Sequence, residues 1–122
     1  PVPAAVALRV LELMEERDIL GHVRAIGPHF EAALAALEDH PLVRGSRAVG
    51  LAGAVDLASP SIESGTLGAE AAACAEANGL FIRPSGDTIV MAPPLIITLD
   101  EIDEMFRRFR LALDGILEGS RK

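Results

Sequence analysis

A tight turn between two short apolar runs is the feature that most constrains this chain. The runs cover residues 80–82 and 88–91, and the sequence Pro-Ser-Gly-Asp at residues 84–87 separates them. Proline fixes φ, glycine tolerates a positive φ, and serine and aspartate side chains bond to nearby backbone, so these four residues favour a turn. Runs rich in Ile, Val and Phe around such a turn predict a β-hairpin, with strands at residues 80–83 and 88–91.

Helical patterns occupy most of the remaining chain. Apolar side chains recur at intervals of three and four in residues 3–17, 22–38 and 100–118, which predicts three helices. Residues 67–77 are rich in alanine and end before Asn-Gly, a common helix terminus, which predicts a fourth helix. The chain therefore begins with a long helical segment and ends with a helix.

The expected fold class is α+β. Residues 47–57 alternate in side-chain character, which predicts one further strand. With the hairpin, this strand would form a small three-stranded antiparallel sheet, covered on one side by the helices at residues 67–77 and 100–118. The last helix should contact the sheet through an apolar stripe made of Ile102, Met105, Phe106, Phe109, Leu113, Ile116 and Leu117.

Composition narrows the class of protein. The 122 residues suit one domain, and a hydrophobic content of 50% argues against disorder. The net charge of −7 argues against binding to nucleic acid, and no apolar run is long enough to predict a membrane span. Cys74 is the only cysteine, which is consistent with a cytoplasmic protein. The chain starts at Pro1, which suggests that it was cut from a longer protein.

Residues that commonly perform catalysis or bind metals form no recognisable motif. His22, His29 and His40 are too widely spaced to share one zinc ion, so surface or capping roles are expected for them. Cys74 lies among alanines, where a small core thiol is expected. We therefore predict no catalytic and no metal-binding residue in this chain.

Three blocks of sequence resemble the class III pyridoxal-phosphate aminotransferases, the fold-type-I enzymes that include the ω-transaminases. Residues 79–103, GLFIRPSGDTIVMAPPLIITLDEID, resemble the end of these proteins. Residues 2–16 resemble the helix that leaves the family's large domain, and residues 40–56 resemble the first strand of its C-terminal domain with its lead-in. The resemblance implies a helical connector at residues 1–40 and a small C-terminal α+β domain at residues 41–122.

The resemblance also has an implication for the cofactor. Pyridoxal phosphate is held on a lysine whose amine must be desolvated and oriented. Lys122 is the only lysine, and a terminal residue should be hydrated. In the family, the Schiff-base lysine lies in the large domain, upstream of Pro1. The resemblance therefore implies that pyridoxal phosphate belongs to a full-length parent, and that this chain alone binds no cofactor and is inactive.

Arg83 is the one candidate substrate-binding residue. Guanidinium stays charged and can hold a carboxylate through two parallel hydrogen bonds. Without the resemblance, an exposed arginine beside a turn is the better interpretation. In the resembling family, however, an arginine at this place in the GLxxRxxGD turn binds the substrate carboxylate, and in amine–pyruvate enzymes it swings aside for substrates that lack one. Asp87 is expected to order the turn.

A departure from related subgroups points to the type of reaction. Ornithine-type relatives carry a carboxylate-binding arginine aligned with Val90, which cannot take that role. The resemblance therefore favours an amine:pyruvate or ω-amino acid transaminase, a homodimer that transfers an amino group from an amine or ω-amino acid to a keto acid such as pyruvate. The alternative is a free-standing α+β module in which Arg83 binds an acidic metabolite. The length of the reading frame distinguishes the two hypotheses.

Overall fold

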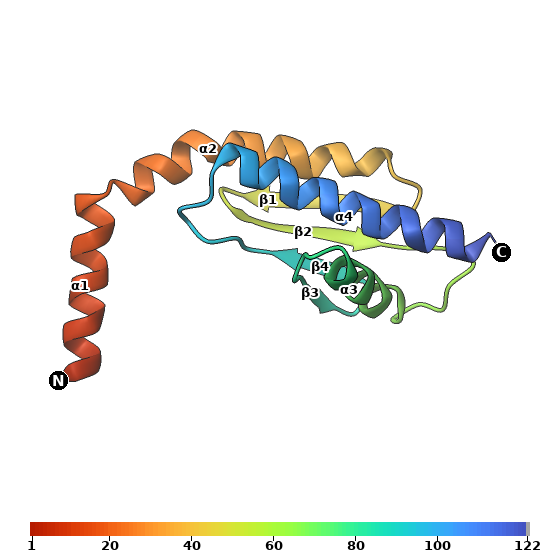
Figure 1. The fold of residues 1–122 in the computed structure, drawn as a ribbon, viewed down its shortest axis with the longest axis horizontal. Helices are drawn as coiled ribbons and strands as arrows, with labels where there is room; N and C mark the ends of the chain where they lie inside the picture. Colours follow the sequence, from red (N-terminus) through yellow and green to blue (C-terminus); the bar gives the residue numbers. More distant parts are fainter. Residues whose placement is uncertain (122) are drawn as a thin grey trace.

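The computed structural model describes residues 1–121, in which helices cover one face of a four-stranded sheet (Figure 1). Lys122 lies outside the described residues. The α+β class is confirmed. The elements in chain order are α1 Val2–Glu16, α2 Ile19–Ala35, the 3₁₀ helix η1 Ala36–Asp39, β1 Val43–Val49, β2 Ala52–Leu57, α3 Leu67–Ala77, β3 Arg83–Ser85, β4 Thr88–Met91 and α4 Leu99–Ser120.

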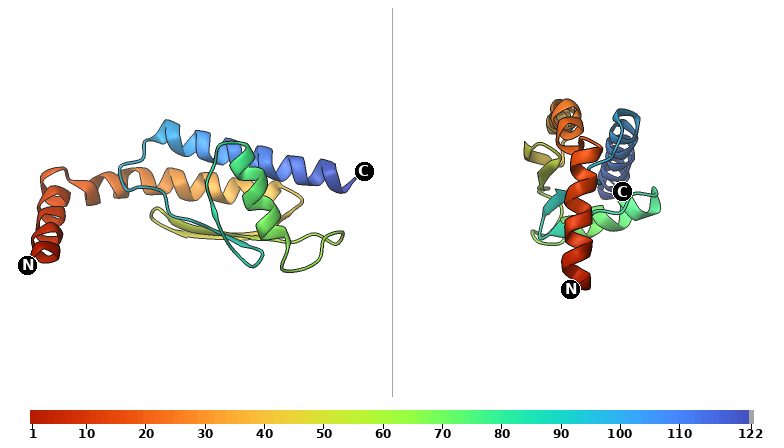
Figure 2. Two further views of the ribbon diagram at one scale, coloured as in Figure 1. Left: turned by 60° about the horizontal axis from the view of Figure 1, so that its bottom comes forward. Right: turned by 90° about the vertical axis from the view of Figure 1, so that its left-hand side faces the viewer.

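The sheet is antiparallel throughout, and its strand order is β1-β2-β4-β3. Figure 2 shows α2, α3 and α4 on the same side of this sheet. Within residues 1–121, no helix covers the opposite face. Because side chains alternate along a strand, each strand presents half of its residues to the helices and half to the uncovered face.

The predicted single strand at residues 47–57 is wrong, because the chain reverses in its middle. Gly50 has a φ of +60° and stands first in a two-residue turn, the place where a type II′ hairpin turn has its glycine. The turn makes Val49 and Ala52 cross-strand partners. The alternating pattern concealed this turn, because glycine and leucine at the turn continue the alternation. The sheet accordingly has four strands instead of three.

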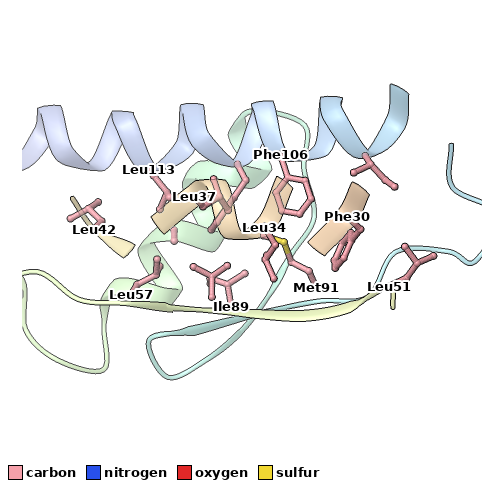
Figure 3. Close-up of a cluster of buried hydrophobic side chains, with 14 of the residues drawn as sticks. Phe30, Leu34, Leu37, Leu42, Leu51, Leu57, Ile89, Met91, Phe106 and Leu113 are labelled. Carbon is pink, nitrogen blue, oxygen red and sulfur yellow. The ribbon is translucent and has the colours of Figure 1, made fainter. Parts of the chain in front are cut away.

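The predicted packing of the last helix is confirmed. Ile102 and Phe109 are fully buried and Phe106 is 6% exposed, so the apolar stripe of α4 lies in the core. The Thr98 hydroxyl and the Glu101 side chain form both hydrogen bonds of a capping box at its N-terminus. Figure 3 shows this core between the helices and the sheet, with labelled side chains from Phe30, Leu34, Leu37, Leu42, Leu51, Leu57, Ile89, Met91, Phe106 and Leu113.

The first helix stands apart from this core. Figure 1 shows α1 projecting away from the helices that cover the sheet, and none of its residues is buried. Its large apolar side chains are largely exposed, and they include Val2, Val6, Leu8, Val10 and Leu11. Helices with apolar side chains on several faces are usually buried. Within the described residues, no helix is long and apolar enough to cross a membrane.

Candidate functional site

A half-open, mainly apolar pocket of about 520 Å³ lies at the open end of the β3–β4 hairpin. Arg83 lies on its exposed edge, and its side chain is the one charged group in the lining. The size is within the range of small-molecule sites. The lining residues are Leu80, Phe81, Ile82, Arg83, Val90, Met91, Ala92, Pro93, Pro94, Ile97 and Met105.

Arg83 points from the face of the sheet that no helix covers. It pairs with Val90 across the β3–β4 ladder, and Val90 pairs in turn with Ala54 of β2. Directly paired residues share a face of the sheet, so the guanidinium lies beside the 40% exposed side chain of Val90. Val90, the position that the family resemblance aligns with the arginine of ornithine-type relatives, is therefore the cross-strand neighbour of Arg83. An arginine at either position would serve the same part of the pocket.

The surroundings of Arg83 leave its guanidinium available to an anion. Among the described residues, no carboxylate lines the pocket and no side chain forms an ion pair with Arg83. Phe81, which lines the same pocket, is 88% exposed, although the other three phenylalanines are buried or nearly so. The site thus combines one unpaired cation with an apolar surface, which suits a small carboxylate with an apolar remainder.

The tip of the hairpin is fixed to the N-terminus of α3 by Asp87. Its carboxylate accepts hydrogen bonds from the backbone N–H groups of Gly65 at 2.6 Å and Gly68 at 3.1 Å. These bonds, that from Gly65 first, lower the pKa of Asp87 below its usual value of 3.8. Asp87 therefore orders the turn between β3 and β4, and it is not part of the lining of the Arg83 pocket.

The pKa of the Asp87 carboxyl is lower in the folded state than in the unfolded chain. The ionised carboxylate therefore stabilises the fold above the unfolded pKa, and this stabilisation is lost as the pH falls through the folded pKa. We expect Asp87→Asn to lower the urea midpoint at neutral pH, since an amide offers one acceptor oxygen in place of two. The difference from the wild type should shrink below about pH 4. Urea titrations at a series of pH values measure it, and a difference that stays constant into strong acid would contradict this role.

The surface role expected for the histidines fits His29, whose side chain is 41% exposed, but not His40, which is buried. Each histidine bonds to the C-terminal segment, and a histidine later in the chain bonds to a partner later in that segment. His22 bonds to the Ile97 carbonyl at 2.8 Å, His29 to Asp103 at 2.6 Å and His40 to Asp114 at 3.1 Å. His40 is buried, and its Nδ1 accepts from the Leu42 N–H, so its Nε2 carries the proton donated to Asp114.

These bonds hold α2 and η1 along α4. The periodicity of one helix contains no signal for a partner on another helix, so these bonds could not be predicted from the sequence. In the described part of the chain, no group of histidine, cysteine and carboxylate side chains could hold a metal ion. Cys74 is half-buried, and burial raises the pKa of its thiol.

The structure is an α+β domain with a pocket that has one arginine in its lining. Comparison with known proteins gives its family. The family model "Aminotransferase class-III" matches residues 1–113. The chain belongs to the class-III aminotransferase family.

Curated relatives of this chain are transaminases of several kinds. It is 34% identical over 119 residues to gamma aminobutyrate transaminase 1, mitochondrial, from Solanum lycopersicum, covering 93% of this chain and 23% of that protein. It is 37% identical over 120 residues to putrescine–pyruvate aminotransferase from Pseudomonas aeruginosa, covering 93% of this chain and 26% of that protein. The chain thus spans about a quarter of the length of these relatives.

Solved structures agree with the fold. A structure described as a transaminase with L-ala superposes with a TM-score of 0.93 at 38% identity, covering 98% of this chain and 30% of that one. The omega transaminase from Pseudomonas jessenii in complex with PMP superposes with a TM-score of 0.91 at 35% identity, covering 98% and 28%. Nearly the whole fold of this chain therefore has a counterpart within much longer transaminase chains.

Proposed function

We propose that this chain is the C-terminal part of a longer aminotransferase that transfers an amino group from an amine or ω-amino acid to a keto acid such as pyruvate. The observation that carries the proposal is Arg83, an unpaired guanidinium on the edge of an apolar pocket in a class-III aminotransferase fold. Its role is to hold the carboxylate of the keto acid. Comparison of the two half-reactions in variants of Arg83 tests this role.

The division of the chain is part of the same proposal. Residues 1–40 would connect to a preceding large domain, and residues 41–122 would form the small domain. The exposed apolar side chains of α1 support a connector that packs against further protein. The parent is proposed to be a homodimer, as the family resemblance implies.

The cofactor of the family does not fit the residues of this chain. Pyridoxal phosphate supplies the means of storing the amino group between the half-reactions, and it requires a desolvated lysine amine. Residues 1–121 contain no lysine, and the lining of the pocket offers no other amine. We propose that the preceding part of the parent holds the cofactor, while this chain contributes the arginine for the substrate.

Borohydride reduction of the isolated chain with pyridoxal phosphate tests this division. We expect no adduct at an internal residue by peptide mass analysis, because no internal amine exists to form one. Labelling at Lys122 or at the N-terminal amine would be consistent with unselective reaction of exposed amines. Stoichiometric binding that persists after Lys122→Ala and N-terminal acetylation would show a cofactor site in this chain and contradict the proposal.

The cellular compartment of the parent also remains a proposal. Relatives include proteins named mitochondrial and chloroplastic as well as a bacterial enzyme. A cytoplasmic location is consistent with the single cysteine of this chain.

A further inference from the structure

The strand that carries Arg83 begins later than its sequence suggests. The apolar run at residues 80–82 predicts a strand that continues to Arg83, but β3 covers only Arg83–Ser85, and the ladder with β4 ends at the Arg83–Val90 pair. Residues 80–82 instead lie outside the ladder and line the pocket. Pro93 and Pro94 on the facing segment have no backbone N–H to donate to a longer ladder. A second interaction holds the near end of residues 80–82 in place.

That interaction lies at the end of α3. Gly79 has a φ of +76°, and the N–H groups of Gly79 and Leu80 bond back to Glu76 and Ala75, which is the Schellman pattern of helix termination. The Gly79 carbonyl then accepts a hydrogen bond of 2.9 Å from Nη1 of Arg108 on α4. The guanidinium of Arg108 lies so close to Gly79 that a Cβ atom added at residue 79 would be 2.5 Å from Nη1.

Arg108 is itself held in a fixed direction. Its Nε donates to Oε1 of Glu104 at 2.7 Å, and Arg107 donates to the same carboxylate at 2.7 Å. Hydrogen bonds from Arg107 and then Arg108 lower the pKa of Glu104 to about 2, so this carboxylate stays ionised in any ordinary buffer. Arg107 contacts Glu104 but not Gly79, which makes it a natural control for Arg108.

The position of α4 explains why this contact matters for the pocket. The helix is anchored in the core by its buried stripe, and Met105, one turn before Arg108, is part of the pocket lining. Arg108 therefore ties Gly79, the residue before the segment 80–82, to a rigid element. The other end of the segment is Arg83, the first residue of the ladder.

We propose that Arg108 is a positioning residue for Arg83: by holding the Gly79 carbonyl against α4, it keeps residues 80–82 apart from β4 and sets the place of the Arg83 guanidinium at the pocket edge. This inference rests on the proposed substrate role of Arg83. Without the anchor, residues 80–82 can approach the facing segment, which narrows the pocket and moves the start of β3. Arg108 touches no substrate in this scheme.

The test uses the full-length parent enzyme and compares Arg108→Met with Arg107→Met. Methionine keeps much of the apolar stem and removes the donor, and both variants lose one partner of Glu104. For Arg108→Met we expect the pyruvate concentration at half-maximal rate to rise about 5- to 20-fold in the acceptor half-reaction, the effect of losing one charge-assisted hydrogen bond. The limiting rate and the half-reaction with a simple amine should change less than about twofold. Arg107→Met should match the wild type, and Arg108→Lys should recover part of the loss.

Arg83→Ala, measured in parallel, separates the two proposals. If Arg83→Ala leaves the acceptor half-reaction unchanged, the proposed substrate role fails, and the positioning role fails with it. If Arg83→Ala impairs the acceptor half-reaction while Arg108→Met and Arg107→Met behave alike, only the positioning role is overturned. Equal losses by Arg108→Met in both half-reactions would mean that Arg108 supports the fold. If Arg108→Met does not fold, Arg108→Lys decides by the same comparison, because its shorter reach weakens the bond to Gly79.

Discussion

Replacing Arg83 with alanine should lower kcat/KM for a keto-acid acceptor by about 30-fold to several thousand-fold in the full-length parent. The change removes a charge-assisted pair with the acceptor carboxylate, for which about 2–5 kcal/mol is expected in a desolvated site. Arg83→Lys should recover little, because a point charge does not reproduce the paired donors of a guanidinium. Stopped-flow measurement of each half-reaction gives the loss for acceptor and donor separately.

The donor half-reaction with a simple amine should change far less than the acceptor half-reaction, because such an amine has no carboxylate. Arg47→Ala is a matched control. Arg47 lies on the same uncovered face of the sheet, at the far end of the row in which Arg47, Ala54, Val90 and Arg83 are successive cross-strand partners. Its guanidinium is already paired with Asp56 at 2.6 Å. Equal losses in the two half-reactions of Arg83→Ala would assign Arg83 to the fold or the cofactor and refute the substrate role.

The parts of the fold that depend on local patterns were predictable from the sequence. The last helix combines a long apolar stripe with a capping box, and the structure has both. The turn before Thr88 was also predicted, and Gly86 takes the positive φ that the turn requires. The β1–β2 hairpin was missed because Gly50 continues an alternation of small side chains. Local alternation does not distinguish a straight strand from two strands joined by a two-residue turn.

The start of β3 was missed for a different reason, because it depends on contacts between distant residues. Residues 80–82 have strand-forming side chains, yet they lie outside the ladder, and the Gly79 carbonyl before them is bonded to Arg108 of a distant helix. Local propensity tends to be overridden where a chain builds a functional site. Arg83 itself was identified by resemblance and not by pattern, since an exposed arginine beside a turn is common. Its lack of an ion-pair partner and the pocket beside it depend on the tertiary structure, which no local pattern predicts.

Gly68→Ala should cause the largest loss of stability among the glycine-to-alanine substitutions of this chain. A Cβ atom at residue 68 would lie 1.9 Å from the Gly86 carbonyl oxygen and 3.0 Å from its carbon. Both are backbone atoms of the hairpin tip and cannot rotate away, so α3 or the tip must move. The movement also strains the hydrogen bond from the Gly68 N–H to Asp87. We expect the free energy of unfolding to fall by about 3 kcal/mol, the upper range for overpacking, as measured by urea denaturation.

Gly115→Ala provides the control for the general effect of removing a glycine from a helix. Gly115 lies in α4 on the exposed side, and a Cβ atom there would meet no atom within 4 Å. Alanine restricts the unfolded chain and suits a helix, so this variant should gain about 0.5–1 kcal/mol. Both variants add a methyl group to a helix but should change stability in opposite directions. At residue 68 the backbone of Gly86 occupies the place of the methyl group, whereas at residue 115 that place is empty. If Gly68→Ala were as stable as the wild type, the hairpin tip would not be docked on α3, and the anchoring of the Arg83 turn by Asp87 would be wrong as well.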